Sequence, residues 1–285
     1  MALLGLVWLT AAGVMAGVVT PVSDAASSFY SAMQDPTNLI NGSGLLGSGD
    51  ILTQTHNNNS SAVGMWHSSG GAVNTTWVSF DFGAPYTLTA AYIWQMNQAG
   101  NLGRGVNTFG LFVSPNATDP ITNYVGTFSL AEAGGTTNEA HQTVTFAAIG
   151  ARQVLFAITN DWNGWANDYV GLSEVRFEGS AMAAIVQQPQ SATNYAWGAQ
   201  TFSVLTAGTP PLSYQWYRAG SPAVALAGAT NSSYTINPVT NGSAGGVLRG
   251  GYQCAERDYQ HGGHAHRAGA GPGLQQRPGG LLSLR

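Results

Sequence analysis

One short segment of the chain concentrates aromatic rings, amides and carboxylates. Residues 160–169 read Asn-Asp-Trp-Asn-Gly-Trp-Ala-Asn-Asp-Tyr. Binding a sugar takes a flat apolar ring against the pyranose C–H bonds and planar polar groups that reach the hydroxyls. We therefore predict ligand contacts from four residues of this segment: Asn160, Asp161, Trp162 and Trp165. Alternatively, one tryptophan caps the core and the others shape a long turn.

A second polar segment covers residues 95–104, which hold four amides and end at an arginine. The guanidinium of Arg104 can bind a sugar hydroxyl or a carboxylate through two hydrogen bonds. It can equally pair with an acid of its own domain, such as Asp81 or Asp161. We predict ligand contacts from Arg104 and Asn97.

Patterns that support catalysis are weak. The chain has no Gly-x-Ser-x-Gly elbow and no His-Glu-x-x-His zinc helix, and without lysine it has no Gly-x-x-x-x-Gly-Lys phosphate loop. Glycoside hydrolysis needs two carboxylates at a set separation, which the sequence does not give for Asp161, Asp168 and Glu174. We predict a protein that is not an enzyme.

Composition excludes several classes of partner. The 285 residues are 44% hydrophobic but only 8% charged, and all nine basic residues are arginine against 13 acids. A net charge of -4 without a basic cluster argues against nucleic acid as a partner. The single cysteine, Cys254, rules out an internal disulfide framework.

The first 21 residues are expected to be a signal peptide or a membrane anchor. They are uncharged and mostly apolar, and Val14-Met15-Ala16 resembles a small-x-small cleavage site. A wrongly placed start codon is a further alternative, because the basic n-region is missing. We predict a secreted or cell-surface protein with no membrane insertion beyond this segment.

The elements that must position these side chains are β-strands. From residue 28 to 179 apolar residues alternate with polar ones, and Gly, Asn or Pro interrupts the pattern every ten residues or so. A turn is expected at 83–85, and no segment has a helical period. The predicted strands are 76–82, 90–94, 109–114, 143–146, 152–159 and 172–177.

A linker at 181–188 leads to a second β-rich region. Strands are expected at 201–205, 212–217 and 233–236. The run Leu-Ser-Tyr-Gln-Trp-Tyr at 212–217 and the run at 229–236 resemble bacterial immunoglobulin-like domains. The resemblance implies a sandwich over 189–245 in which Trp216 packs between two sheets.

The sequence pattern changes in residues 246–285. Residues 246–285 carry no alternating strand pattern after Tyr252, although an immunoglobulin-like domain still needs its closing strands. A shifted reading frame is one explanation and a natural Gly/His/Arg tail the other. The histidines at 261, 264 and 266 suit a transition metal, but would have no evolved role after a frame shift.

With the strands placed, residues 22–180 resemble the discoidin family, the coagulation factor 5/8 type C domains. The resemblance rests on Asn-Leu-Ile-Asn-Gly-Ser-Gly-Leu at 38–45 and Trp-Val-Ser-Phe-Asp-Phe-Gly at 77–83. It also rests on the runs at 104–114 and 171–179. It implies an all-β, galactose-binding-like jelly roll, followed here by an immunoglobulin-like sandwich that is incomplete at its C-terminal end.

The same resemblance implies site residues. Many family members bind carbohydrate, and their early loops border the binding face, which here adds Trp66 and His67 as contacts. Family members often hold a structural calcium, for which Asn41, Ser43 and Glu174 would be ligands. Alternatively, residues 41–42 form a plain turn and Glu174 is an ordinary strand residue.

These observations predict a secreted, non-catalytic carbohydrate-binding or adhesion protein. Its first domain would hold a glycan or polysaccharide by aromatic stacking and amide hydrogen bonds, and the second would act as a spacer. One alternative is the targeting fragment of a larger secreted glycoside hydrolase. Another is a cell-surface adhesion protein that binds a protein partner.

Overall fold

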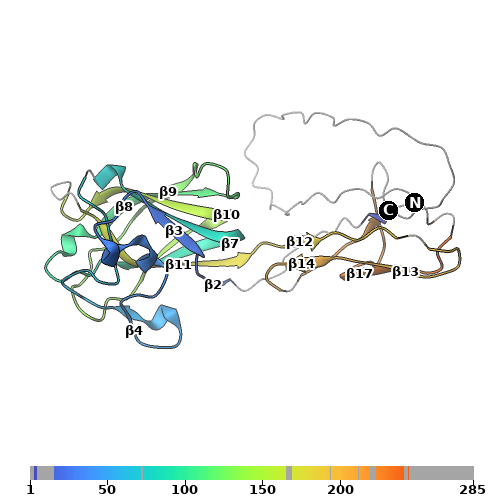
Figure 1. The fold of residues 1–285 in the computed structure, drawn as a ribbon, viewed down its shortest axis with the longest axis horizontal. Coiled ribbons are helices and arrows are strands. Elements are labelled where there is room, and N and C mark those ends of the chain that lie inside the picture. Colours follow the sequence, from blue (N-terminus) through green and yellow to red (C-terminus); the bar gives the residue numbers. More distant parts are fainter. Residues whose placement is uncertain are drawn as a thin grey trace. The chain divides into compact units, whose positions relative to one another are not determined.

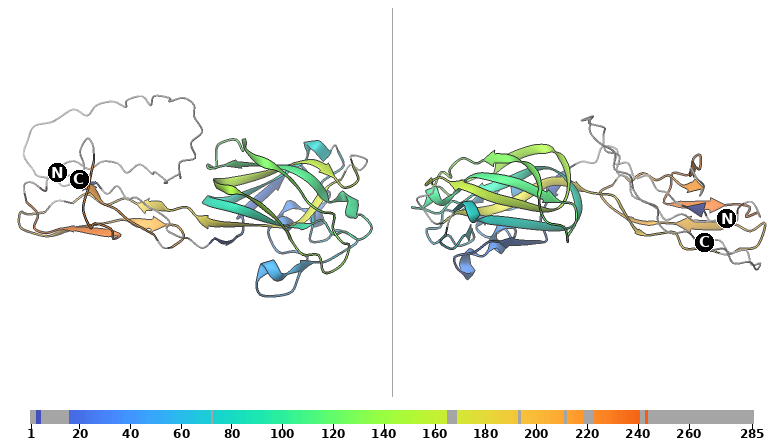
Figure 2. Two further views of the ribbon diagram at one scale, coloured as in Figure 1. Left: turned by 180° about the vertical axis from the view of Figure 1, so that it is seen from behind. Right: turned by 90° about the horizontal axis from the view of Figure 1, so that it is seen from above.

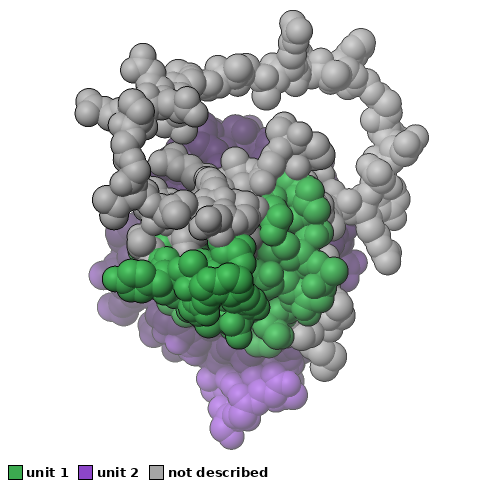
Figure 3. Space-filling view, turned by 90° about the vertical axis from the view of Figure 1, so that its right-hand side faces the viewer, with its two compact units in different colours: residues 1–14, 183–285 green, residues 15–182 purple. Residues whose placement is uncertain are grey.

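The chain folds into two compact units, one of residues 15–182 and one of residues 1–14 with 183–285 (Figure 3). A computed structural model describes residues 3–4, 16–71, 73–164, 169–192, 194–210, 212–218, 223–240 and 243. Each unit has its own cluster of buried apolar side chains. Among the described residues, no helix is long and apolar enough to cross a membrane.

An eight-stranded antiparallel sheet forms the frame of residues 15–182. Its strands follow the order β2-β11-β7-β10-β8-β9, while β3 pairs with β7 and β6 with β11 (Figure 1). Sequence neighbours are often not spatial neighbours, as expected for a jelly roll. The strands are β2 (Gly17–Val19), β3 (Ser23–Ala26), β6 (Trp66–His67), β7 (Trp77–Gln95), β8 (Val106–Ser114), β9 (Asn123–Ser129), β10 (Gln142–Asp161) and β11 (Gly171–Ala181).

Two long strands carry the sheet from one layer of the sandwich to the other. Residues 77–82 of β7 pair with β3 and with 153–157 of β10, whereas 86–95 pair with β11 and with 142–151 of β10. Register shifts in β10 mark the bend. The sequence wrongly predicted two strands in place of each, because the Gly83 region bends the ladder without ending it.

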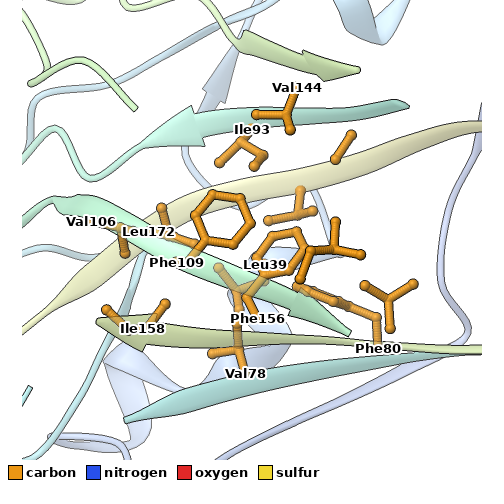
Figure 4. Close-up of a cluster of buried hydrophobic side chains, with 14 of the residues drawn as sticks. Leu39, Val78, Phe80, Ile93, Val106, Phe109, Val144, Phe156, Ile158 and Leu172 are labelled. Atoms are coloured by element: carbon orange, nitrogen blue, oxygen red, sulfur yellow. The ribbon is translucent and has the colours of Figure 1, made fainter. Parts of the chain in front are cut away.

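The core lies between the two layers. Val78, Phe80 and Phe82 alternate on one face of β7 and are all buried, as the period of two requires. Phe80 meets Phe156 at 5.3 Å between ring centroids, and Phe156 meets Phe109 at 4.5 Å (Figure 4). The all-β sandwich predicted for residues 22–180 is confirmed, and its two layers are visible in Figure 2.

Short strands and 3-10 helices lie in the segments that connect the strands of this sheet. They are the two-residue strands β4 (Leu45–Leu46) and β5 (Thr55–His56) and the 3-10 helices η1 (Ala32–Gln34), η2 (Pro36–Leu39), η3 (Ile51–Thr53), η4 (Val73–Thr75) and η5 (Leu102–Arg104). Side-chain caps begin several of them: the Asp35 carboxylate accepts from the Thr37 N–H, and Asp50 does the same for Leu52. Residues 17–19, expected to belong to the leader, form β2 beside β11.

The second unit contains paired short strands around a small core. They are β1 (Leu3–Leu4), β12 (Ala184–Gln187), β13 (Gln200–Ser203), β14 (Leu205–Ala207), β15 (Tyr217–Arg218), β16 (Val224–Ala225) and β17 (Ser233–Ile236). Trp216 is fully buried against Phe202 and Val204, and its Nε1 donates to the Asn231 carbonyl at 2.8 Å. The expected frame-shifted tail, 246–285, lies outside the described residues.

Candidate functional site

The jelly roll contains a polar pocket of about 330 Å³, here called the Arg104 pocket. It is large enough for a single sugar ring. Its walls combine aromatic rings, amides and one guanidinium. The lining residues are Tyr30, Gln34, Ser61, Ala62, His67, Gln98, Arg104 and Tyr169.

Hydrogen bonds between backbones bring the aromatic side chains together. The Tyr30 N–H donates to the His67 carbonyl at 2.8 Å, which places the N-terminal segment beside β6. Tyr169 immediately precedes β11, whose Gly171 pairs with His67. The rings of His67 and Tyr169 stack at 5.1 Å, and Tyr30 meets both edge-on.

Arg104 is placed by the residue that follows it. Gly105 forms a bridge with Gly171, so the end of η5 lies next to the start of β11. The Arg104 guanidinium sits 4.9 Å from the centre of the Tyr169 ring, within cation–π range. Its Nη1 donates to His67 Nε2 at 3.4 Å, and its Nε is buried without a hydrogen-bond partner.

The electrostatics of the pocket keep His67 neutral. Burial, and to a smaller extent the nearby Arg104 charge, lower the pKa of His67 to about 4. An arginine nitrogen can only donate, so the His67 Nε2 that faces it must be an acceptor. The pocket thus contains a single positive charge.

Two buried amides complete the walls. Gln34 donates through Nε2 to the Ser61 carbonyl at 2.7 Å, and Gln98 donates to the Ser60 carbonyl at 2.7 Å. Gln98 Oε1 is buried without a partner. The loop they hold contains Ala62 with a positive φ of 54°, a strained conformation for a residue with a Cβ. Strain of this kind is frequent at binding sites.

Two of the predicted contact residues prove to be core residues. Trp66 is fully buried, and its Nε1 donates to the Ser28 carbonyl at 3.0 Å. Because side chains alternate along a strand, Trp66 faces the core where its neighbour His67 faces the pocket. Asn97 is also fully buried, and its Nδ2 donates to the carbonyls of His56, Asn57 and Thr136. The structure does not support ligand contacts by Trp66 or Asn97.

Among the described residues of the 160–169 segment, Tyr169 lines the pocket, whereas residues 160–164 do not. Trp162 leaves 41% of its side chain exposed, and its N–H donates to the Gly105 carbonyl at 3.2 Å. Asp161 is buried at the end of β10, and Asn160 is half-buried on the same strand. Trp165 and Asp168 lie outside the described residues. Contacts by Asn160, Asp161, Trp162 and Trp165 stay predictions.

Sequence reasoning selected Arg104 and His67 separately and missed most of their neighbours in the pocket. Tyr30 and Gln34 come from the segment before the first predicted core strand. No periodic pattern there indicates which side chains will line a pocket. Gln98 and Tyr169 stand inside the two segments singled out above, next to the residues that were chosen. Of the two acids considered as partners of Arg104, Asp81 pairs instead with Arg152 at 3.2 Å, and no ion pair between described residues joins Arg104 to Asp161.

The predicted calcium ligands do not fit a cation site. Asn41 Oδ1 accepts from the Ser43 N–H at 2.7 Å, which makes residues 41–43 an ordinary Asx turn. Glu174 is fully buried, accepts from the Gly42 N–H at 3.0 Å and is paired with Arg176. Burial raises the pKa of Glu174, and the Arg176 guanidinium offsets part of that shift.

Arg176 takes the place that a cation would need. Its Nη1 bonds to the Leu39 carbonyl at 3.4 Å as well as to the Glu174 carboxylate, so it links η2 to β11. Calcium takes six to eight oxygen ligands, most of its affinity coming from carboxylates. Among the described residues, no group of three or more His, Cys, Asp or Glu side chains is arranged to hold a metal.

The comparison with protein families identifies the first unit. Residues 24–174 match the F5/8 type C domain, so the chain belongs to this family. No curated protein matches the chain.

Solved structures of related fold cover the same part of the chain. One is the module CBM32-3 of a family 31 glycoside hydrolase from Clostridium perfringens, 16% identical, covering 58% of this chain and 95% of that chain, with a TM-score of 0.40. Another is chitosan-binding module 2 of a chitosanase/glucanase from Paenibacillus sp. IK-5, in complex with chitotriose (18%, 56% and 96%, 0.37). A third is the family 32 module of NanJ from Clostridium perfringens, in complex with galactose (18%, 55% and 92%, 0.35).

Proposed function

We propose that residues 15–182 bind a carbohydrate reversibly in the Arg104 pocket and carry out no chemistry on it. The observation that carries the proposal is the composition of the pocket wall. Three aromatic rings, two amides and a guanidinium surround a space of about 330 Å³ in a domain of the F5/8 type C family. Rings for stacking and planar groups for hydroxyls are what sugar recognition requires.

Tyr30 is the best stacking surface in this pocket. Its side chain is 61% exposed, and its ring packs nearly perpendicular to the rings of His67 and Tyr169. A ring held in place by other rings loses little conformational freedom when a ligand stacks on it. Gln98 Oε1 and the Arg104 Nε offer an acceptor and a donor without partners in the protein.

Secretion, a non-catalytic role and a spacer-like second domain belong to the same proposal. The uncharged apolar start of the chain supports export, and the weak catalytic patterns support binding alone. The immunoglobulin-like interpretation of residues 189–245 is kept as part of it, supported by the burial of Trp216. The alternative is that this chain is the targeting fragment of a larger secreted glycoside hydrolase.

Glycan-array binding of the full chain tests the proposal, with Tyr30→Ala as the variant. We expect native binding to at least one glycan and a loss of about tenfold in affinity for the variant, equivalent to about 1.4 kcal/mol. Tyr124→Ala is the matched control, because Tyr124 on β9 is 59% exposed and does not line the pocket.

The outcome distinguishes carbohydrate binding in the Arg104 pocket from binding elsewhere and from a protein-binding role. A folded chain that binds no glycan would overturn carbohydrate binding and leave the role of a protein-binding adhesion domain. Equal losses in the Tyr30 and Tyr124 variants would place the sugar elsewhere on the domain.

A further inference from the structure

Positive charge is scarce in residues 15–182, which contain three arginines and no lysine. Arg152 pairs with Asp81 at 3.2 Å, and Arg176 pairs with the buried Glu174. Arg104 is the third, and among the described residues it has no carboxylate within ion-pair distance. Two of the three fixed cations are therefore neutralised, and the one in the pocket is not.

Among the described residues that line the Arg104 pocket, none is acidic and could balance that charge. Its lining residues are aromatic, amide or small, with Arg104 as the one formal charge. Burial and the Arg104 charge hold the pKa of His67 at about 4, so at neutral pH the histidine adds none. The pocket presents one uncompensated positive charge, which suits one anionic group.

The Arg104 guanidinium also has more N–H donors than its contacts with His67 and Tyr169 use. It carries five N–H groups. Arg104 contacts His67 through Nη1 and the Tyr169 ring through the face of the cation. These two contacts fix the plane of the guanidinium before a ligand arrives. A preorganised, partly desolvated guanidinium binds carboxylate or sulfate oxygens more strongly than neutral hydroxyls, because the hydrogen bonds are charge-assisted.

We propose that the Arg104 pocket selects an anionic sugar, one that carries a carboxylate or a sulfate ester, over the neutral sugar of the same shape. This selection rests on the proposed function, because it names the ligand class of the same site. Neutral sugars still bind through stacking and amide contacts. Amino sugars bind worst, because their ammonium group meets the uncompensated guanidinium.

Calorimetric titration of the full chain tests the selection with ligands matched in shape. The probes are galacturonic acid, galactose 6-sulfate, galactose and galactosamine, with the glucose series beside them. We expect at least tenfold tighter binding of an acidic sugar than of its neutral counterpart at low salt. The advantage should shrink as salt is added, since salt screens the charge–charge attraction.

Arg104→Gln keeps a planar polar group but removes the charge. We expect it to weaken binding of the acidic sugar by a larger factor than binding of its neutral counterpart, so that the preference is lost. Arg152→Gln is the control, because it removes a cation outside the pocket. Equal or tighter binding of the neutral sugars by the native chain would overturn the selection and leave carbohydrate binding intact. Absence of binding by every sugar would instead overturn the proposed function. A larger gain with the sulfate than with the carboxylate would identify the anionic group.

Discussion

His67 illustrates how one residue acquires its properties from its surroundings. Its ring stacks on Tyr169 and accepts from Arg104, and only 4% of its surface is exposed. A protonated ring would place a second positive charge beside the guanidinium and lose its acceptor nitrogen. Both effects, together with burial, favour the neutral form.

The titration of His67 follows from these contacts. Its pKa in the folded domain is about 4, below the ordinary 6.5. A depressed pKa gives stability that is fully present above pH 6.5 and is lost as pH falls toward 4, because the unfolded chain binds the proton first. Ligand affinity should stay constant from about pH 8 to about pH 5, since His67 does not change charge in that window.

An NMR titration of the ring protons measures this pKa directly, with affinity measured at the same pH values. His67→Gln is the informative variant, because it keeps an acceptor and cannot titrate. Its stability should fall less steeply on acidification than that of the native chain. A measured His67 pKa at or above 6.5 would contradict the buried, neutral ring.

At the scale of elements, the link between η2 and β11 depends on a buried ion pair. Glu174 accepts a hydrogen bond from the Gly42 N–H, and Arg176 donates one to the Leu39 carbonyl. The ion pair therefore links the segment 39–42 to β11. Removing one partner leaves the other charge buried and uncompensated, whereas removing both leaves none.

We expect Arg176→Met to lower the free energy of unfolding by about 3 kcal/mol, and the double variant with Glu174→Leu to lose less than the two single variants together. Because the Arg176 guanidinium already pairs with the Glu174 carboxylate, neither added calcium nor a chelator should change the melting temperature of the native chain. Chemical denaturation and thermal melting measure both. A clear drop in melting temperature with the chelator would restore the calcium prediction.

At the scale of the whole molecule, the two units have separate cores. Every buried residue of the larger cluster lies between Leu39 and Phe177, and every buried residue of the smaller one lies between Phe202 and Ala229. The described lining residues of the Arg104 pocket all lie between Tyr30 and Tyr169.

Truncation after residue 182 should therefore leave the jelly roll folded and its ligand affinity unchanged. We expect its melting temperature to stay within about 2 °C, the shift that a change of a few tenths of a kcal/mol produces in a domain of this size. Calorimetry and glycan binding of the truncated chain measure both. A marked loss of either would show that residues 183–285 support the first domain.

Much of this protein was determined by the sequence alone. Alternation at Val78, Phe80 and Phe82 reflects a local constraint, because successive side chains of a strand must face opposite sides. The all-β class and the family of residues 24–174 followed from such patterns and from short motifs. Arg104 was also found, because a run of polar side chains stands out from an alternating pattern, and His67 was found through the family resemblance.

The tertiary structure decided which neighbours join them. Tyr30, Gln98 and Tyr169 reach the pocket through pairings between segments far apart in the chain, and no local signal encodes those pairings. Trp66 and His67 are adjacent in sequence and both buried, so only the direction in which each side chain points separates the core residue from the pocket residue. Glu174 and Arg176 lie two residues apart on β11, but only the packing of η2 against β11 showed that the pair is buried and that Arg176 reaches the Leu39 carbonyl. Sequence fixes what each side chain can do, and packing fixes which side chains meet.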